Sequence, residues 1–234
     1  MSIYNYLKGR FYTNKEGADK ENEKVPIPKD VDTVLENLKE VFKDCDDLIY
    51  REFNVGENQQ YKFLLVCIDG LSDKALIDNF VLESLMLCAR DIRPNGESVK
   101  KRLFELTKNA SLTTTEIKEE DDLNGVVTSI LSADTALFID GYGKAIVIGT
   151  KSWPARGPSE PKSEGVVRGP SDGFVETLRF NTALVRRRIR DPRLKIVQKS
   201  IGVRSKTDIA VVYIDDIVNK DLLKEVNERL KDIE

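Results

Sequence analysis

Hydrophobic and polar positions divide the first third of the chain into a helix and two strands. From Asp30 onward, apolar side chains recur at steps of three and four residues, which predicts a helix with one apolar stripe and Asp30 or Asp32 as its N-cap. Residues 48–55 alternate in part and residues 61–68 are almost continuously apolar, which predicts two strands. Gly56-Glu57-Asn58 supplies a turn between them. The second strand is expected to be buried on both faces.

The middle of the chain continues the alternation of helices and strands. Residues 75–90 predict a mostly buried helix, and residues 99–106 and 123–131 predict two shorter ones. A strand is expected at residues 111–117. The acidic run Glu116–Asp122 is predicted to be a solvated connection rather than a binding site, because runs of charge usually face water.

The second half repeats the first in outline. A strand over residues 135–140 ends in Ile139-Asp140-Gly141, which echoes Ile68-Asp69-Gly70. Residues 144–150 are expected to pair back on this strand across the turn Gly141-Tyr142-Gly143. The similarity is a weak internal repeat.

The C-terminal segments are a helix, two strands and a second helix. The first helix is expected over residues 174–190 and stops at Asp191-Pro192, because the residue before a proline disfavours helical backbone. Residues 194–203 and 208–215 predict two strands. The last helix begins after Asn219, whose side chain is a good N-cap.

Helices and strands therefore alternate in two clusters, which predicts an α/β fold of two small α/β subdomains separated by a cleft. We expect a mobile polar leader and then two subdomains with a connector, over residues 1–26, 27–118, 119–133 and 134–234. The last helix is still amphipathic at the end of the sequence. The chain is therefore expected to be the front part of something longer.

Composition narrows the classes of function. The chain has 234 residues, of which 40% are hydrophobic, and its 40 acidic and 37 basic residues give a net charge of −3. Despite the basic run from Arg186 to Lys195, no overall field favours nucleic acid, and no nucleic-acid partner is expected. Three widely spaced cysteines indicate a reducing compartment. The longest apolar runs are far shorter than the roughly 20 residues that cross a bilayer.

Histidine is absent from the chain. The commonest general base and the commonest neutral metal ligand are therefore missing. Asp215-Asp216 could contribute to binding a hard cation, but the sequence shows no third ligand for it. We expect no catalysis, no cofactor and no metal site.

The helix over residues 174–190 carries an arginine stripe. Arg179, Arg186 and Arg190 lie on one arc at 100° per residue. A separate apolar arc is predicted to be its buried face and consists of Phe174, Leu178, Val185 and Ile189. The arginines are suited to a phosphate or carboxylate, or to the acidic residues of the preceding loop. The alternative is a solvated face near a helix C-terminus, where cations are favoured.

Two carboxylates follow predicted strand ends. Asp69 and Asp140 each precede a glycine, and Ser72 and Tyr142 lie in the same two turns. In open α/β sheets such loops contact ligands, and a carboxylate there accepts hydrogen bonds from an ammonium or hydroxyl group. The alternative is that Asp-Gly only makes a tight turn, which we favour at Asp140.

The segment from Trp153 to Asp191 is the most distinctive part of the chain. It combines a Trp-Pro corner, alternating carboxylates and arginines, an Arg-Gly-Pro turn and the arginine-rich helix. Its spaced motifs are Trp153-Pro154, Arg156, Glu160-Pro161, Glu164 to Pro170, Gly173-Phe174, Glu176, Leu178-Arg179, Asn181 and Leu184 to Ile189. Their order resembles the soluble N-terminal region of the A subunit of GerA-type spore germinant receptors.

This resemblance implies a receptor of A, B and C subunits in the spore inner membrane, which senses nutrients such as amino acids, sugars or inorganic ions and triggers germination. It also implies an architecture similar to solute-binding proteins. The region would lie on the cytosolic, spore-core side, and a C-terminal part absent from this chain would reach the membrane.

Three hypotheses follow from the residues and the resemblance together. In the first, the chain senses or transmits a nutrient signal, with a small germinant in the cleft. The candidate cleft residues are Asp69, Ser72, Asp140, Tyr142, Arg156, Arg168, Glu176 and Arg179. In the second, the chain assembles with B, C or other A subunits through a surface that includes Arg186, Arg187 and Arg190. The third, an enzyme with paired carboxylates, has no recognisable constellation.

Overall fold

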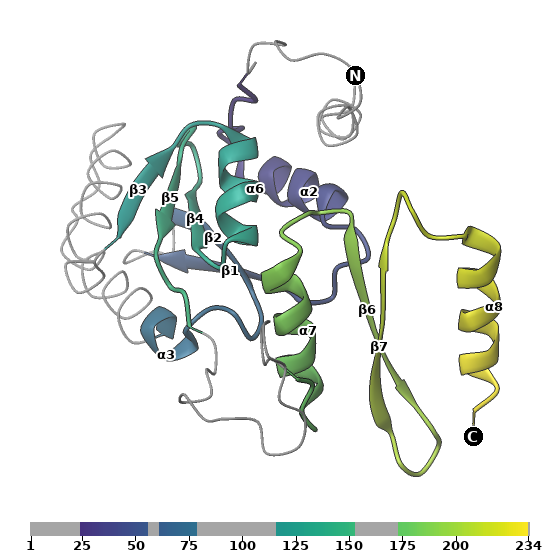
Figure 1. The fold of residues 1–234 in the computed structure, drawn as a ribbon. Helices are drawn as coiled ribbons and strands as arrows, with labels where there is room; N and C mark the ends of the chain where they lie inside the picture. The colour runs from purple at the N-terminus through teal and green to yellow at the C-terminus, as the bar shows by residue number, and fades with distance from the viewer. Residues whose placement is uncertain (1–23, 56–60, 79–115, 153–172, 234) are drawn as a thin grey trace, which may run out of the picture.

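Five strands form an antiparallel sheet in the order β1-β2-β4-β5-β3 (Figure 1). The structure is a computed structural model that describes residues 24–55, 61–78, 116–152 and 173–233. The strands are Leu48–Val55 (β1), Tyr61–Ile68 (β2), Ile117–Glu120 (β3), Thr135–Ile139 (β4) and Ala145–Ile148 (β5). The turn predicted at residues 56–58 and most of the helices predicted at 75–90 and 99–106 lie outside the described residues.

Both faces of this sheet are buried. Helix α2 (Val31–Val41) and helix α6 (Leu123–Leu131) share one hydrophobic cluster with alternate residues of β2 and β4. The other face packs with the short helix α3 (Lys74–Leu76) through the neighbouring Ile77. Because both faces are covered, β2, β4 and β5 are continuously apolar rather than alternating. Asp30 caps α2 as predicted, and its side chain accepts a hydrogen bond from the Thr33 amide.

The strands assigned by sequence to two subdomains belong to one sheet. Strand β4 pairs with β2, with Phe63 opposite Ile139 and Val66 opposite Ala136. The expected connector over residues 119–133 does not divide this sheet, because α6 is packed into its core. The pairing of β2 with β4 joins residues that are about 70 positions apart in sequence, and local periodicity does not report such a contact.

Two smaller expectations also need correction. The acidic run predicted to be a solvated connection contains β3, an edge strand paired with β5. Charged side chains suit an edge strand, and Lys144 pairs with Glu119 at 3.1 Å. The polar leader ends earlier than expected, because Val25 is buried and its carbonyl accepts a hydrogen bond from the Leu123 amide.

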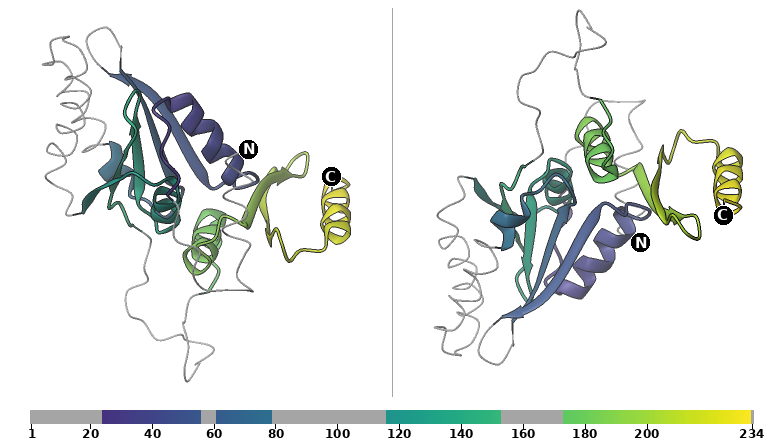
Figure 2. Two further views of the ribbon diagram at one scale, coloured as in Figure 1. Left: turned by 90° about the horizontal axis from the view of Figure 1, so that it is seen from above. Right: turned by 90° about the horizontal axis from the view of Figure 1, so that it is seen from below.

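The C-terminal part comprises a helix, a hairpin and a final helix (Figure 2). These are α7 (Leu178–Arg188), β6 (Leu194–Ile201), β7 (Thr207–Ile214) and α8 (Lys220–Lys231). Asn219 caps α8 as predicted. Strands β6 and β7 form a separate two-stranded antiparallel sheet.

Helix α7 begins four residues later than predicted. The Asn181 side chain donates to the Val175 carbonyl and accepts from the Val175 amide, which holds the chain outside helical geometry there. Phe174 therefore lies outside the helix and is exposed rather than buried. The predicted apolar stripe is not the buried face, since the buried residues of α7 are Thr182, Ala183 and Arg186.

The segment before β1 joins the hairpin to the sheet. Cys45 forms a parallel bridge with Ile196 of β6. The Asp46 amide donates to the Ile196 carbonyl at 2.9 Å, and the Ile196 amide donates to the Asp44 carbonyl at 3.0 Å. The Asp46 side chain also accepts from the Gln198 amide at 2.8 Å. Strand β6 is thus fixed by backbone pairing to the chain that enters β1.

Within the described ranges, none of the helices combines the length and apolarity that a membrane crossing requires.

Candidate functional site

Two arginines of α7 hold two aspartates at one end of the sheet. Arg179 and Arg186 are seven residues apart, which is about two helical turns, so they share one face of α7. Asp47 immediately precedes β1 and Asp69 immediately follows β2. The two aspartates are neighbours in register, because the Asp69 amide donates to the Asp47 carbonyl at 2.8 Å. We call these four residues the arginine–aspartate clamp.

The inner half of the clamp is a buried bidentate ion pair. Arg186 donates from Nε to Asp47 Oδ2 at 2.8 Å and from Nη2 to Asp47 Oδ1 at 2.9 Å. The exposed fractions of the two side chains are 0% and 3%. Nη1 of the same guanidinium donates to the carbonyl of Asp191, which follows α7, and to the carbonyl of Leu194, the first residue of β6. One side chain therefore ties the segment after α7 to the entrance of β1.

The charge of Arg186 is maintained by this environment. Burial acts against the charged guanidinium, but the hydrogen bonds and the charge of Asp47 outweigh it, so the pKa of Arg186 is raised. The buried thiol of Cys45 lies beside the pair, and its Sγ donates to the Leu194 carbonyl at 3.4 Å. Burial raises the pKa of the Cys45 thiol. The thiol therefore stays neutral next to the ion pair.

Arg186 was predicted to belong to an interaction surface, and the structure contradicts this. Its side chain is completely buried and all of its hydrogen bonds are internal. Burial of an arginine is tolerated only when its charge and donors are matched, and Asp47 with two carbonyls provides this match. Arg190, at the end of the same predicted stripe, is exposed, and Arg187 is half-buried.

The outer half of the clamp is partly open to solvent. Arg179 Nε lies 2.9 Å from Asp69 Oδ2, with 53% of the arginine side chain and 22% of the aspartate side chain exposed. Lys74 Nζ lies 2.8 Å from Asp69 Oδ1. Gly70 has a φ of +80°, and a Cβ there would lie 3.0 Å from Arg179 Cγ. The absence of a side chain at Gly70 allows α7 to approach the end of β2 closely.

The predicted cleft residues are only partly brought together. Asp69 and Arg179 are paired in the clamp, and Ser72 lies buried three residues beyond Asp69. Glu176 is exposed just before α7. Arg156 and Arg168 lie outside the described residues.

Asp140 and Tyr142 lie at the opposite end of the sheet from Asp69. The Asp140 amide donates to the Lys62 carbonyl near the start of β2, whereas Asp69 follows the end of β2. At about 3.3 Å per residue the two aspartates are about 20 Å apart along the strand. The predicted site required strand ends that meet at one edge, as in parallel sheets, but β2 and β4 are antiparallel. One ligand in one cleft therefore does not contact both aspartates.

Asp47 of the clamp and Lys74, which pairs with Asp69 beside it, were not predicted from the sequence as site residues. The sequence feature that could have indicated Asp47 is its position, because this carboxylate directly precedes a strand whose first residue is buried. Its partner is 139 residues away in the chain, so the pairing itself had no local signature.

The chemistry of the clamp is that of a joint between elements. Each carboxylate is already matched by an arginine, so little capacity remains at these atoms for a further cation. Across the described residues, no group of three or more cysteine, aspartate or glutamate side chains is arranged to hold a metal ion. The arrangement couples α7 and β6 to the ends of β1 and β2.

Comparison with known proteins places this fold in a defined class. The described part of the chain is a mixed α/β domain in which an arginine–aspartate joint connects a sheet to a helix and hairpin. It is similar to the crystal structure of the N-terminal domain of the A subunit of the Bacillus megaterium spore germinant receptor GerK3. The TM-score is 0.70 at 26% sequence identity, over 91% of this chain and 75% of that chain.

The family model described as Bacillus/Clostridium GerA spore germination protein matches residues 36–234, and the chain belongs to this family. Stage V sporulation protein AF of Bacillus subtilis is 36% identical over 73% of this chain and 33% of its own length. Spore germination protein B1 of the same organism is 35% identical over 88% of this chain and 41% of its own length. The chain therefore spans well under half the length of these relatives.

Proposed function

We infer that this chain is the N-terminal domain of the A subunit of a nutrient germinant receptor and transmits a nutrient signal through the arginine–aspartate clamp. The receptor would contain B and C subunits in the spore inner membrane, with this domain on the cytosolic, spore-core side. The family, the similar germination proteins and the match to the GerK3 domain support this assignment.

The proposal rests on the way the clamp joins α7 and the hairpin to the five-stranded sheet. The buried half, Arg186 with Asp47, fixes α7 and β6 to the sheet. The open half, Arg179 with Asp69, lies where solvent reaches the pair, and Lys74 also pairs with Asp69 there. An exposed ion pair contributes at most about 1 kcal/mol, so it can be made and broken at little cost while the buried pair stays intact. The open half is therefore the element suited to switching between two arrangements.

Replacing Arg179 with glutamine in the full-length receptor is expected to slow nutrient-triggered germination severalfold. The fold should be almost unchanged, because the lost ion pair is half exposed. Germination is followed as the fall in optical density of a spore suspension after nutrient addition, in a strain without another copy of the receptor. Receptor abundance is measured by immunoblot, and unfolding of the 234-residue chain by urea denaturation.

Arg190→Gln is the matched control, since Arg190 is an exposed arginine of the same segment. A charge exchange, Arg179→Asp with Asp69→Arg, should recover part of the response if the pair itself matters. A normal nutrient response from Arg179→Gln at normal abundance would refute transmission through the clamp.

Subunit assembly is a second candidate function, supported by exposed apolar side chains on the C-terminal part. Val203, Ile217 and Leu222 are large apolar residues with more than half of their surface exposed. Isolated apolar residues are common on surfaces, but three in one hairpin-and-helix region suit contact with another receptor subunit. Sedimentation velocity of the chain over a range of concentrations tests this, and a single unchanged species would argue against self-association.

Direct sensing of the germinant in a cleft between two subdomains, as in solute-binding proteins, stays a prediction. Titration of the chain with candidate germinants, followed by backbone amide shifts, distinguishes it from transmission alone. Saturable shifts around Asp69 would support a germinant at the clamp. If no amide shifts occur around Asp69, the domain does not bind the germinant at the clamp. It would then transmit a signal that another subunit receives.

A further inference from the structure

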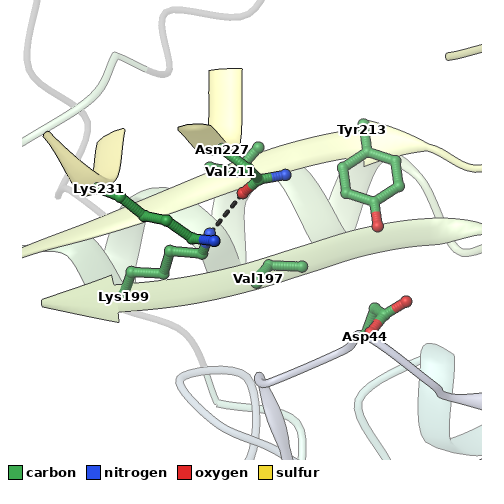
Figure 3. Close-up of a pocket in the computed structure, with 7 residues that line it drawn as sticks. All are labelled: Asp44, Val197, Lys199, Val211, Tyr213, Asn227 and Lys231. Atoms are coloured by element: carbon green, nitrogen blue, oxygen red, sulfur yellow. Dashed lines mark hydrogen bonds between the residues drawn. The ribbon is translucent and has the colours of Figure 1, made fainter. Parts of the chain in front are cut away.

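A cavity of about 340 Å³ lies between the β6–β7 hairpin and α8 (Figure 3). Its size is within the usual range for small-molecule sites. The lining residues are Asp44, Val197, Lys199, Val211, Tyr213, Asn227 and Lys231.

One end of this pocket is cationic. Lys199 of β6 donates a hydrogen bond to the Asn227 side-chain oxygen, and the Asn227 amide nitrogen donates to the Leu223 carbonyl at 2.8 Å. Asn227 is thus fixed by its own helix and orients Lys199. Lys231 lines the same pocket and makes no hydrogen bond or ion pair with any residue that the structure describes. Two ammonium groups in one small cavity repel each other, and an anion between them would remove this repulsion.

The other end of the pocket is anionic. Asp44 and the Tyr213 hydroxyl lie there, away from the lysines (Figure 3). Asp44 has a φ of +60°, a left-handed conformation that aspartate and asparagine adopt more readily than most residues. Burial and the carboxylates of Asp44 and Asp215 raise the pKa of Tyr213, so its hydroxyl stays protonated. The Asp44 side chain has no hydrogen-bond partner among the described residues.

An apolar floor connects the two ends. Val197 and Val211 are a cross-strand pair, and Tyr213 and Lys199 lie on the same face of the hairpin on either side of them. Tyr213 pairs with Lys195, four residues from Lys199, so the backbone positions of the two ends are about 13 Å apart. The long lysine side chains shorten this span. A ligand that contacts both ends therefore needs an aliphatic body of several carbons.

We propose that this pocket binds a small organic zwitterion whose carboxylate lies between Lys199 and Lys231, whose aliphatic body covers Val197 and Val211, and whose ammonium group faces Asp44. Each part of the ligand then meets groups of complementary chemistry, and the Tyr213 hydroxyl is placed to hydrogen-bond at the ammonium end. The site shares no residue with the clamp, and its occupancy does not depend on the transmission proposed above.

The test uses 5-aminopentanoate as the probe and the ¹⁵N-labelled 234-residue chain. Saturable amide shifts are expected in β6, β7 and the last turns of α8. Lys199→Gln and Lys231→Gln should each weaken binding about tenfold or more, because each removes a charged hydrogen-bond partner of the carboxylate. Pentanoate, which lacks the ammonium group, should bind more weakly. Asp44→Asn should reduce 5-aminopentanoate to the affinity of pentanoate, and asparagine also tolerates the left-handed backbone.

Several results would overturn the proposal. One is the absence of saturable shifts, and another is an affinity that neither lysine substitution changes. Inorganic phosphate that binds as tightly as 5-aminopentanoate would show an anion site without selectivity for a zwitterion. Arg179→Gln is the control that should leave the affinity unchanged, so the pocket and the clamp are tested independently.

Discussion

Replacing Arg186 with methionine is expected to lower the free energy of unfolding by about 3–5 kcal/mol, because Asp47 would remain buried without its partner. Methionine is unbranched and fills much of the same space, so the loss reports the charge rather than a cavity. The carbonyls of Asp191 and Leu194 also lose a donor. Urea denaturation followed by circular dichroism measures the change, provided that the slope with denaturant stays constant.

Two further variants separate the ion pair from a general effect of losing an arginine. Arg190→Gln removes an exposed arginine close by and should change the free energy of unfolding by no more than about 0.5 kcal/mol. Arg186→Met combined with Asp47→Leu leaves no unpaired charge and should recover most of the loss. If Arg186→Met were as stable as Arg190→Gln, the buried pair would not be the joint between α7 and the sheet.

Local elements of the fold were predictable because their signals are local. The β1 and β2 ranges, helix α6 and the Asn219 cap follow from periodicity and capping chemistry within a few residues. The grouping of strands was not predictable in this way. Strand β2 is apolar throughout, which says that both faces are covered but not which strand lies beside it. The echo between Asp69-Gly70 and Asp140-Gly141 favoured two copies of one unit, whereas both turns belong to a single antiparallel sheet.

The arginine stripe shows a different limit of sequence reasoning. The spacing of Arg179 and Arg186 correctly placed them on one face of a helix. The sequence left open whether that face meets a carboxylate or solvent, and the error was to predict the apolar arc as the buried face. Which face is buried depends on what the sheet presents, and here it presents Asp47 and Asp69. A helix with a weakly apolar sequence can bury an arginine when a carboxylate from a distant part of the chain pairs with it. The sequence of the helix alone does not indicate that this carboxylate is present.

Replacing Phe138 with alanine is expected to lower the free energy of unfolding by about 3–5 kcal/mol and to do so for the whole five-stranded sheet. Phe138 belongs to β4, which the sequence placed in a second subdomain, yet its side chain is in the same core cluster as Leu38 of α2 and Leu64 of β2. A shared core unfolds cooperatively, so backbone amides in β2 and β4 should lose the same amount of protection against hydrogen exchange. Native-state hydrogen exchange measures each strand separately.

Val203→Ala is the control for this substitution, because Val203 is among the most exposed apolar residues of the hairpin, and truncating it should change the free energy of unfolding by no more than about 0.5 kcal/mol. If Phe138→Ala weakened protection in β4 and β5 but left β1 and β2 unchanged, two independent units would be present despite the continuous sheet. An equal loss of hydrogen-exchange protection in all of these strands would mean that the sheet is one rigid body. The clamp then joins α7 and the hairpin to the whole sheet. A signal that displaces α7 would then be transmitted to all of the sheet rather than to one half of it.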